Sequence, residues 1–289
     1  ILFILYTQPL TSVILKHPVS HMLYADDTQV YKSFGLNDCL SSILCVEKCV
    51  SDVKTWMTSN KLQMNEDKTE VLLVTAKRVV NLQHLPEFMN INGTCVKFSP
   101  SVRNLGVTLD STLSLHQHVI NVCRVAYLEL RRINSIRNLL SIDAVKTLVC
   151  SLVLSRLDYC NSLLVGLPQY LIKRLQGVQN AAARSILRTP RSEHISPLLQ
   201  NLHWLPVNRR TLHKVAALCH TSLSGSGPQY LSDLTHVYTP ARSLRSSSDT
   251  RILSTPNVKL KSYGQRSFAY HGPTTWNSLP LALRHQQES

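Results

Sequence analysis

The pattern of apolar residues changes at residue 113, and this change restricts the folds that the chain can adopt. Before it, short apolar runs alternate with turn signals, among them Asn92-Gly93, a strong signal for a tight β-hairpin. After it, four long stretches show the three-to-four-residue apolar spacing of helices: 116–140, 142–165, 168–188 and 207–223. The sequence therefore predicts an α+β chain in which a mixed region precedes a mostly helical one.

The expected elements of the first region follow from its apolar spacing and its turns. They are an apolar helix or strand-helix join over 1–15, a hairpin over 20–33, an amphipathic helix over 37–60 with Asn37 as its cap, a strand over 69–75, a hairpin around 91–95 and a strand over 102–110. A flexible break, SGSGP at 224–228, divides the rest. We expect three regions: 1–113, 114–223, and a partly irregular 224–289.

The charge of the chain is distributed unevenly between these regions. Residues 1–113 contain 10 basic and 10 acidic residues, which leaves 21 of the 31 basic and 7 of the 17 acidic residues for 114–289. The formal net charge of +14 therefore belongs to the helical part. Such a surface attracts polyanions such as nucleic acid, although a basic surface can also serve solubility alone.

Cysteine usage and hydropathy indicate the compartment. The eight cysteines form no CxxC pair and the twelve histidines no HExxH array, so we predict reduced thiols, mostly buried, and no structural zinc. No apolar run approaches a membrane span, and the opening ILFILY lacks the basic leader of a signal peptide. We expect a cytoplasmic or nuclear protein that is neither secreted nor membrane-bound. The first methionine is Met22, which predicts a fragment of a longer chain.

Two adjacent carboxylates, Asp26 and Asp27, interrupt the strand-like run HMLYADDTQVYK at 21–32. At a hairpin tip, two carboxylates that converge are best neutralised by divalent cations, and hard oxygen ligands suit Mg²⁺. The alternative is an ordinary polar turn, in which Asp is common.

The stretch LYADDTQVY resembles the active-site hairpin of reverse transcriptases, and further stretches resemble later segments of the same family in the same order. These are WMTSNKLQMNEDKTEVLLV, VRNLGVTLD, SLVLSRLDYCNSLLVGLP, LQGVQNAAARSIL, HISPLLQNLHWLPVNRR and FAYHGPTTWNSLPLALR. Together they resemble the C-terminal portion of a non-LTR (LINE-type) retrotransposon reverse transcriptase, comprising the end of the palm, the thumb and a C-terminal extension. The similarity covers nearly all of the 289 residues.

The resemblance implies an RNA-directed DNA polymerase that uses two Mg²⁺ ions, an RNA template, a DNA primer and deoxynucleoside triphosphates. The implied site residues are the metal ligands Asp26 and Asp27, Lys68 near the triphosphate, Tyr24 and Ala25 beneath the primer end, and Leu105 and Gly106 in the primer grip. Lys68 also fits a solvated turn lysine, and Gly106 also fits a plain strand bulge.

The chain departs from the family upstream of this hairpin. The third catalytic carboxylate, the Pro-Gln-Gly loop of the nucleotide pocket and the fingers all precede the family's equivalent of ILFILY. Glu70 and Asp110 align with later palm strands and do not replace that carboxylate. We therefore expect no polymerisation by this chain alone, because a misplaced metal costs orders of magnitude in rate.

The helical region carries basic residues that suit the phosphates of nucleic acid. Spacing places Arg184, Arg188 and Arg191 on one helix face, and the doublets are Arg131-Arg132, Lys173-Arg174 and Arg209-Arg210. Stacking on nucleic-acid bases is one role open to Trp204 and Trp276, but their spacing favours anchoring the core at a helix end. Two alternatives to a polymerase fragment remain open: a non-catalytic nucleic-acid-binding protein, and the translation product of a decayed element that does not fold stably.

Overall fold

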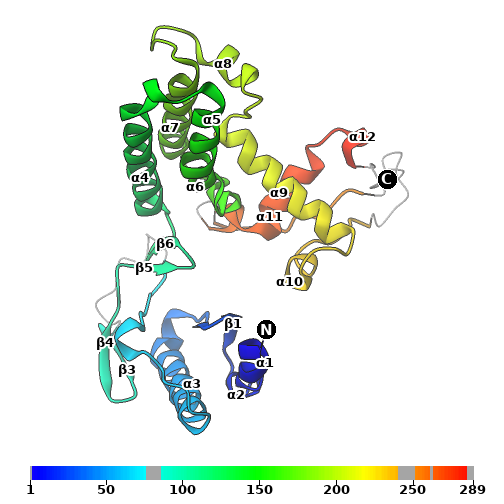
Figure 1. The fold of residues 1–289 in the computed structure, drawn as a ribbon. Helices are drawn as coiled ribbons and strands as arrows, with labels where there is room; N and C mark the ends of the chain where they lie inside the picture. Colours follow the sequence, from blue (N-terminus) through cyan, green and yellow to red (C-terminus); the bar gives the residue numbers. More distant parts are fainter. Residues whose placement is uncertain (1, 76–85, 240–250, 261–262, 285–289) are drawn as a thin grey trace. The chain divides into compact units, whose positions relative to one another are not determined.

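The computed structural model describes residues 2–75, 86–239, 251–260 and 263–284. The chain divides into two compact units, Ile1–Leu113 and Ser114–Ser289 (Figure 1). Within the described residues, the strands form three separate two-stranded antiparallel sheets, and helices make up most of the remainder. The fold class is α+β, as the sequence predicted.

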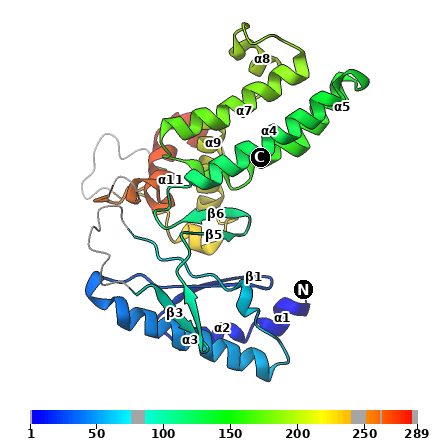
Figure 2. The ribbon, with the colours of Figure 1, turned by 90° about the vertical axis from the view of Figure 1, so that its left-hand side faces the viewer.

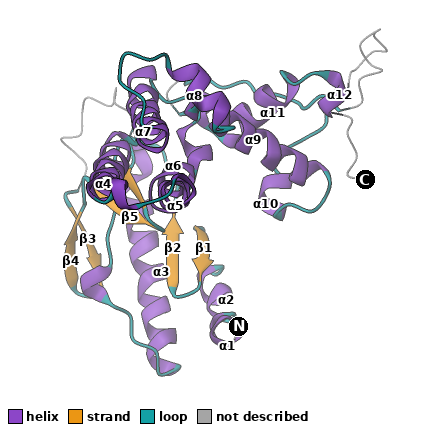
Figure 3. Ribbon diagram, turned by 45° about the horizontal axis from the view of Figure 1, so that its top comes forward, coloured by secondary structure: helices purple, strands orange, loops and turns teal. Residues whose placement is uncertain are grey.

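The first unit is built on one long helix, α3, whose inner side packs against the N-terminal elements (Figure 3). Leu10 and Ile14 from the N-terminal helices meet Cys49 and Val53 of α3 in a small core, which the partly buried Leu23, Val30 and Trp56 border. The elements are α1 (Leu2–Thr7), α2 (Leu10–Ile14), β1 (Ser20–Tyr24), β2 (Asp27–Tyr31) and α3 (Cys39–Ser59).

A second hairpin, β3 (Phe88–Ile91) and β4 (Thr94–Lys97), also packs on α3 (Figure 2). Its turn is Asn92-Gly93, and both residues have the positive φ that two-residue hairpin turns need. The carboxylate of Glu47 on α3 accepts a hydrogen bond from the backbone N–H of Asn90 at 2.5 Å. The hairpins over 20–33 and 91–95 were thus predicted correctly from their turn signals.

Three local predictions for this unit were wrong. Helix α3 begins at Cys39 with Asp38 as its N-cap, because a 3-10 turn, η1 (Leu36–Asp38), takes up the predicted cap Asn37. The apolar run 69–75 is no strand, since Val71 makes only an isolated bridge to Phe98. The stretch 102–110 is a hairpin, β5 (Ser101–Asn104) and β6 (Val107–Asp110), and not one strand.

The second unit is a set of helices around α7, whose buried face consists mainly of Leu171, Leu175, Val178, Ala182 and Ile186. Helices α4, α5, α8 and α9 all pack against α7. The elements of this unit are α4 (His116–Ser135), η4 (Arg137–Leu139), α5 (Ile142–Val149), the π-helical turn η5 (Cys150–Leu154), α6 (Ser155–Asp158), η6 (Asn161–Leu164), α7 (Gln169–Leu187), α8 (Ile195–Asn201), α9 (Val207–Leu223), α10 (Gln229–Ser232), η8 (Gly264–Arg266), α11 (Phe268–Asn277) and α12 (Leu281–Arg284).

Part of the C-terminal segment is ordered by packing on α9. The indole of Trp276 on α11 is 2% exposed and shares a core with Val215 and Cys219 of α9. Its Nε1–H donates to the carbonyl oxygen of Arg251 at 2.7 Å. Trp204 is also buried, so both tryptophans anchor the core as predicted. No helix among the described residues is both long and apolar enough to cross a membrane.

Two imidazoles in this unit lead to a prediction about acid stability. Burial lowers the pKa of His118 on α4 and of His271 on α11 below the ordinary 6.5. Below about pH 6.5 the unfolded chain takes up protons that the folded chain resists, so acid favours unfolding through these groups, whereas above that pH they contribute no such effect. We expect the urea midpoint to fall between about pH 7.5 and about pH 5.5. The double variant His118→Gln/His271→Gln should lose less over this range; an equal loss would contradict the assignment.

Candidate functional site

The tip of the β1–β2 hairpin carries the two adjacent carboxylates. Tyr24 and Asp27 form the last antiparallel pair, so Ala25 and Asp26 are the two turn residues. Ala25 has a φ of 54°, a left-handed conformation that costs an L-residue about 1–2 kcal/mol. All four residues are exposed, and Tyr24 is 63% exposed. The turn therefore presents both carboxylates to solvent at one end of the hairpin.

The residues at this tip provide only part of a metal site. Carboxylate oxygens are the donors that Mg²⁺ prefers, and Mg²⁺ is commonly held by one or two carboxylates together with substrate phosphates. Across the described parts of the chain, however, no three His, Cys, Asp or Glu side chains are grouped to hold a metal ion. Asp26 and Asp27 thus fit the donor chemistry, but the described residues do not complete the ligand set that the resemblance implies.

A side-chain contact joins this hairpin to the β5–β6 hairpin. The amide Nε2 of Gln29 on β2 donates to Oδ1 of Asn104, the last residue of β5, in a part-buried hydrogen bond. Gln29 lies two residues after Asp27, and Asn104 directly precedes Leu105. The strand that begins at Asp27 and the turn of the β5–β6 hairpin are therefore neighbours within the first unit.

Leu105 and Gly106 are the two central residues of the β5–β6 turn, with φ of 44° and 83°. Both positive values match the twist of a two-residue hairpin turn, so the alternative of a bulge within one strand is wrong. Gly106 takes its φ without the steric cost that Leu105 bears. Leu105 is half-buried, and Gly106 is exposed. The turn is tight, and its glycine leaves the backbone accessible.

Lys68 lies at the end of the 3-10 turn η2 (Glu66–Lys68), and its side chain is exposed. Its backbone N–H donates to Oδ1 of Asn65 at 3.2 Å, and Lys54 on α3 pairs with Glu66 at 2.5 Å. No hydrogen bond or ion pair of the described residues joins Lys68 to Asp26 or Asp27. The Lys54–Glu66 pair therefore holds this turn against α3, and Lys68 itself makes no such contact with the acidic tip.

The predicted arginine stripe does not lie on one helix face. Helix α7 ends at Leu187, Arg188 is its C-cap with a left-handed φ of 54°, and Arg191 lies beyond the helix. Pro190 follows closely, and the residue before a proline disfavours the helical conformation. Arg184 donates to the carbonyl of Glu193 at 3.0 Å, and Arg188 to Oδ1 of Asn138 at 3.2 Å. These two arginines thus stabilise the end of the helix and its loop.

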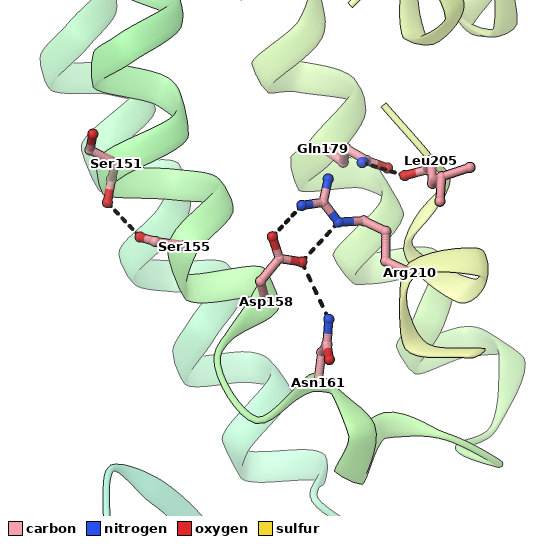
Figure 4. Close-up of polar contacts among 7 residues, drawn as sticks. All are labelled: Ser151, Ser155, Asp158, Asn161, Gln179, Leu205 and Arg210. Atoms are coloured by element: carbon pink, nitrogen blue, oxygen red, sulfur yellow. Dashed lines mark hydrogen bonds and ion pairs between the residues drawn. The ribbon is translucent and has the colours of Figure 1, made fainter. Parts of the chain in front are cut away.

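The basic doublets differ in how free their side chains are. Arg210 forms a fork with Asp158, through Nε to Oδ1 at 2.8 Å and through Nη2 to Oδ2, and Asn161 also donates to Asp158 (Figure 4). Arg210 therefore joins α9 to the end of α6, and its prediction as a nucleic-acid contact conflicts with this structural role. The other members of the doublets are exposed: Arg131, Arg132, Lys173, Arg174 and Arg209. Among them, Arg132 also pairs with Glu129 at 3.2 Å.

The difference between Arg209 and Arg210 gives a paired prediction. Arg210→Gln removes the fork and leaves the half-buried Asp158 without its cation, so the free energy of unfolding should fall by about 1–2 kcal/mol. Arg209→Gln changes an exposed side chain and should alter it by less than about 0.5 kcal/mol. Urea denaturation of both variants checks this expectation. Equal losses would show that the fork does not stabilise the unit.

The sequence does not distinguish Arg137, which is buried, from the exposed basic residues of the helical unit. Its side chain is buried, with the residue 7% exposed, and all three of its donating nitrogens bond to backbone carbonyls of Leu140, Ser185 and Ile186. Two exposed tyrosines, Tyr127 on α4 and Tyr170 on α7, also went unnoticed. The sequence could have indicated both, because each tyrosine has basic residues three or four positions away on a predicted helix.

Comparison of the chain with protein-family models, curated proteins and solved structures finds no match. The case for a function therefore depends on the two adjoining hairpins, the acidic tip and the exposed cations of the helical unit.

Proposed function

We propose that this chain supplies the acidic hairpin, the end of the palm and the thumb of an RNA-directed DNA polymerase of the non-LTR retrotransposon type. The observation that carries the proposal is the hydrogen bond between Gln29 and Asn104. It makes the Leu105-Gly106 turn a neighbour of the strand that starts at Asp27, and a primer grip beside a catalytic carboxylate pair needs this arrangement. Residues 1–113 would belong to the palm, 114–223 to the thumb and 224–289 to the extension.

In the complete enzyme, Asp26 and Asp27 would hold Mg²⁺, and the third carboxylate would come from polypeptide outside these 289 residues. Bound metal would activate the primer 3′-hydroxyl and neutralise the pyrophosphate. Tyr24 and Ala25 would lie beneath the primer end, where the small side chain of Ala25 lets the duplex approach. An RNA template, a DNA primer and deoxynucleoside triphosphates would be the substrates, in the cytoplasm or the nucleus.

RNA-templated primer extension tests this proposal. The 289-residue chain, with Mg²⁺, primed RNA and deoxynucleotides, should yield no product because the third carboxylate, the nucleotide-pocket loop and the fingers that the resemblance implies are not among its residues. The same chain preceded by a family segment with the third carboxylate, the nucleotide-pocket loop and the fingers (hereafter the restored chain) should extend the primer. Processive extension by the 289-residue chain, or none by a folded restored chain that binds the primer and template, would contradict the proposal.

A second candidate function is nucleic-acid binding without catalysis, which the excess of exposed cations in residues 114–289 favours. If four cations neutralise phosphates of a single strand, log K should fall against log salt with a slope of about −3, or about fiftyfold between roughly 50 and 200 mM salt. Fluorescence anisotropy with a labelled oligonucleotide measures this slope. An isotherm that does not change with salt would rule out phosphate neutralisation as the basis of binding.

A further inference from the structure

Helices α4 and α7 lie side by side and run in the same direction (Figures 1 and 3). Tyr170 near the start of α7 contacts His116 at the start of α4, with Tyr170 Oη and His116 Nδ1 3.4 Å apart. Near the ends of both helices, Ser185 on α7 bonds to Asn134 on α4. The two helices therefore share a continuous seam, which we call the α4–α7 seam.

Exposed side chains on each side of this seam follow a helical repeat. On α4, residues 124, 127, 128 and 131 fall at i, i+3, i+4 and i+7, and they are Arg, Tyr, Leu and Arg, all exposed. On α7, Tyr170 precedes the exposed Lys173 and Arg174 by three and four positions. Each tyrosine is thus flanked by cations on its own helix face.

The two tyrosines lie along the seam and are open to solvent. Tyr127 is 47% exposed and Tyr170 is 53% exposed. The hydroxyl of Tyr127 lies against α7 at Gly177, where the Cβ of any larger residue would come within 3.2 Å of it. On α4, Tyr127 lies eleven positions after His116, the partner of Tyr170, which corresponds to about 16 Å along the helix axis. The rings are therefore spaced along one line and are not stacked on each other.

The two helices that form the seam carry almost entirely positive charge. Helix α7 contains no acidic residue and α4 only Glu129, which pairs with Arg132. Together the two helices carry six basic residues: Arg124, Arg131, Arg132, Lys173, Arg174 and Arg184. Burial raises the pKa of the Tyr127 phenol above its ordinary value, and the charge of Arg191 opposes this rise. Aromatic rings that alternate with cations along one line match the chemistry of a single nucleic-acid strand, in which bases stack and phosphates pair.

We propose that the α4–α7 seam binds single-stranded nucleic acid, with bases stacked on Tyr127 and Tyr170 and phosphates paired with Arg124, Arg131, Lys173 and Arg174. This inference rests on the proposed function only for its ligand class. It adds a path for the nucleic-acid strand along α4 and α7, and it adds two aromatic contacts that are not part of the acidic tip. Binding is independent of base sequence, because every base has a face that can stack.

The test uses fluorescence anisotropy to measure the affinity of the 289-residue chain for a labelled oligo-uridine strand and for a labelled oligo-thymidine strand. The double variant Tyr127→Leu/Tyr170→Leu keeps the charges and apolar bulk but removes both rings. It should bind at least about tenfold more weakly, with an unchanged salt slope. Arg174→Gln should instead reduce the magnitude of the slope by about 0.7. The control Tyr230→Leu alters an equally exposed tyrosine on α10, 57% exposed and followed by Asp233, and should bind normally.

Several results would overturn the proposal that the α4–α7 seam binds single-stranded nucleic acid. These are no binding by the unaltered chain, unchanged affinity in a folded double variant, an equal loss in the Tyr230 control, or stronger binding to a duplex than to a single strand. Primer extension by the restored chain separates this inference from the proposed function. If the restored chain extends the primer but the double tyrosine variant binds the strand with unchanged affinity, only the seam proposal is refuted. If binding depends on the tyrosines but the restored chain gives no extension, only the polymerase proposal is refuted.

Discussion

Replacing Asp26 by Asn in the restored chain is expected to slow primer extension by at least about a thousandfold. Asparagine keeps the size and shape of the side chain but removes the charge that a metal ligand at the hairpin tip must supply. Asp26 is an exposed turn residue, so this change should leave the fold intact. Single-turnover extension with saturating Mg²⁺ measures the rate, and thermal unfolding verifies the fold.

A matched control for this variant is Asp67→Asn, which neutralises another exposed aspartate of the first unit, in the η2 turn. Its extension rate should stay within about twofold of the parent, since Asp67 is no proposed metal ligand, its turn makes no described hydrogen bond or ion pair with the acidic tip, and solvent and salt screen a surface charge. If Asp26→Asn were as active as Asp67→Asn, Asp26 would not be a metal ligand and the proposed role of the tip would fail.

Arg137→Met is expected to destabilise the helical unit by about 3 kcal/mol. The guanidinium donates to the carbonyls of Ser185, Ile186 and Leu140 at 3.1, 2.9 and 3.1 Å. Two of these carbonyls lie at the end of α7, where helix carbonyls lack intrahelical partners and the helix dipole is negative. Methionine fills similar space but offers no donor, so these buried acceptors would lose their bonds.

Arg131→Met serves as the control for this variant, because Arg131 is exposed and its side chain makes no hydrogen bond or ion pair with any residue that the structure describes. Its loss should be under about 0.5 kcal/mol. Urea denaturation followed by circular dichroism measures both variants. A loss below about 1 kcal/mol for Arg137→Met would mean that other groups satisfy the end of α7.

Local signals were enough to predict several elements of the fold. The hairpins at 20–33 and 91–95 have turn residues at their centres, and α3, α4, α7 and α9 show clear apolar periodicity. The run 69–75 has strand composition, but a strand needs a partner along its length, and residue spacing does not reveal one. Helix α11 contains Gly272 and Pro273, which both disfavour helix, and packing of Trp276 on α9 compensates for them.

The site shows the same division between local and long-range information. The sequence correctly predicted that Asp26 and Asp27 share a hairpin tip, because the turn is local. The contact between Gln29 and Asn104 spans 75 residues, and no spacing rule predicts it. Arg209 and Arg210 look equivalent in sequence, yet only Arg210 meets Asp158, since adjacent helix positions point in different directions.

The most direct test of the central claim is to find where the primer end lies on the protein. A DNA primer with a photoreactive 3′-terminal nucleotide is annealed to RNA and bound to the 289-residue chain. The complex is then irradiated, and the crosslinked peptides are identified by mass spectrometry. If the acidic tip and the β5–β6 turn face the primer end, crosslinks should fall within 20–31 and 101–110. Crosslinks confined to the β3–β4 hairpin or to the helical unit would contradict the proposed polymerase site.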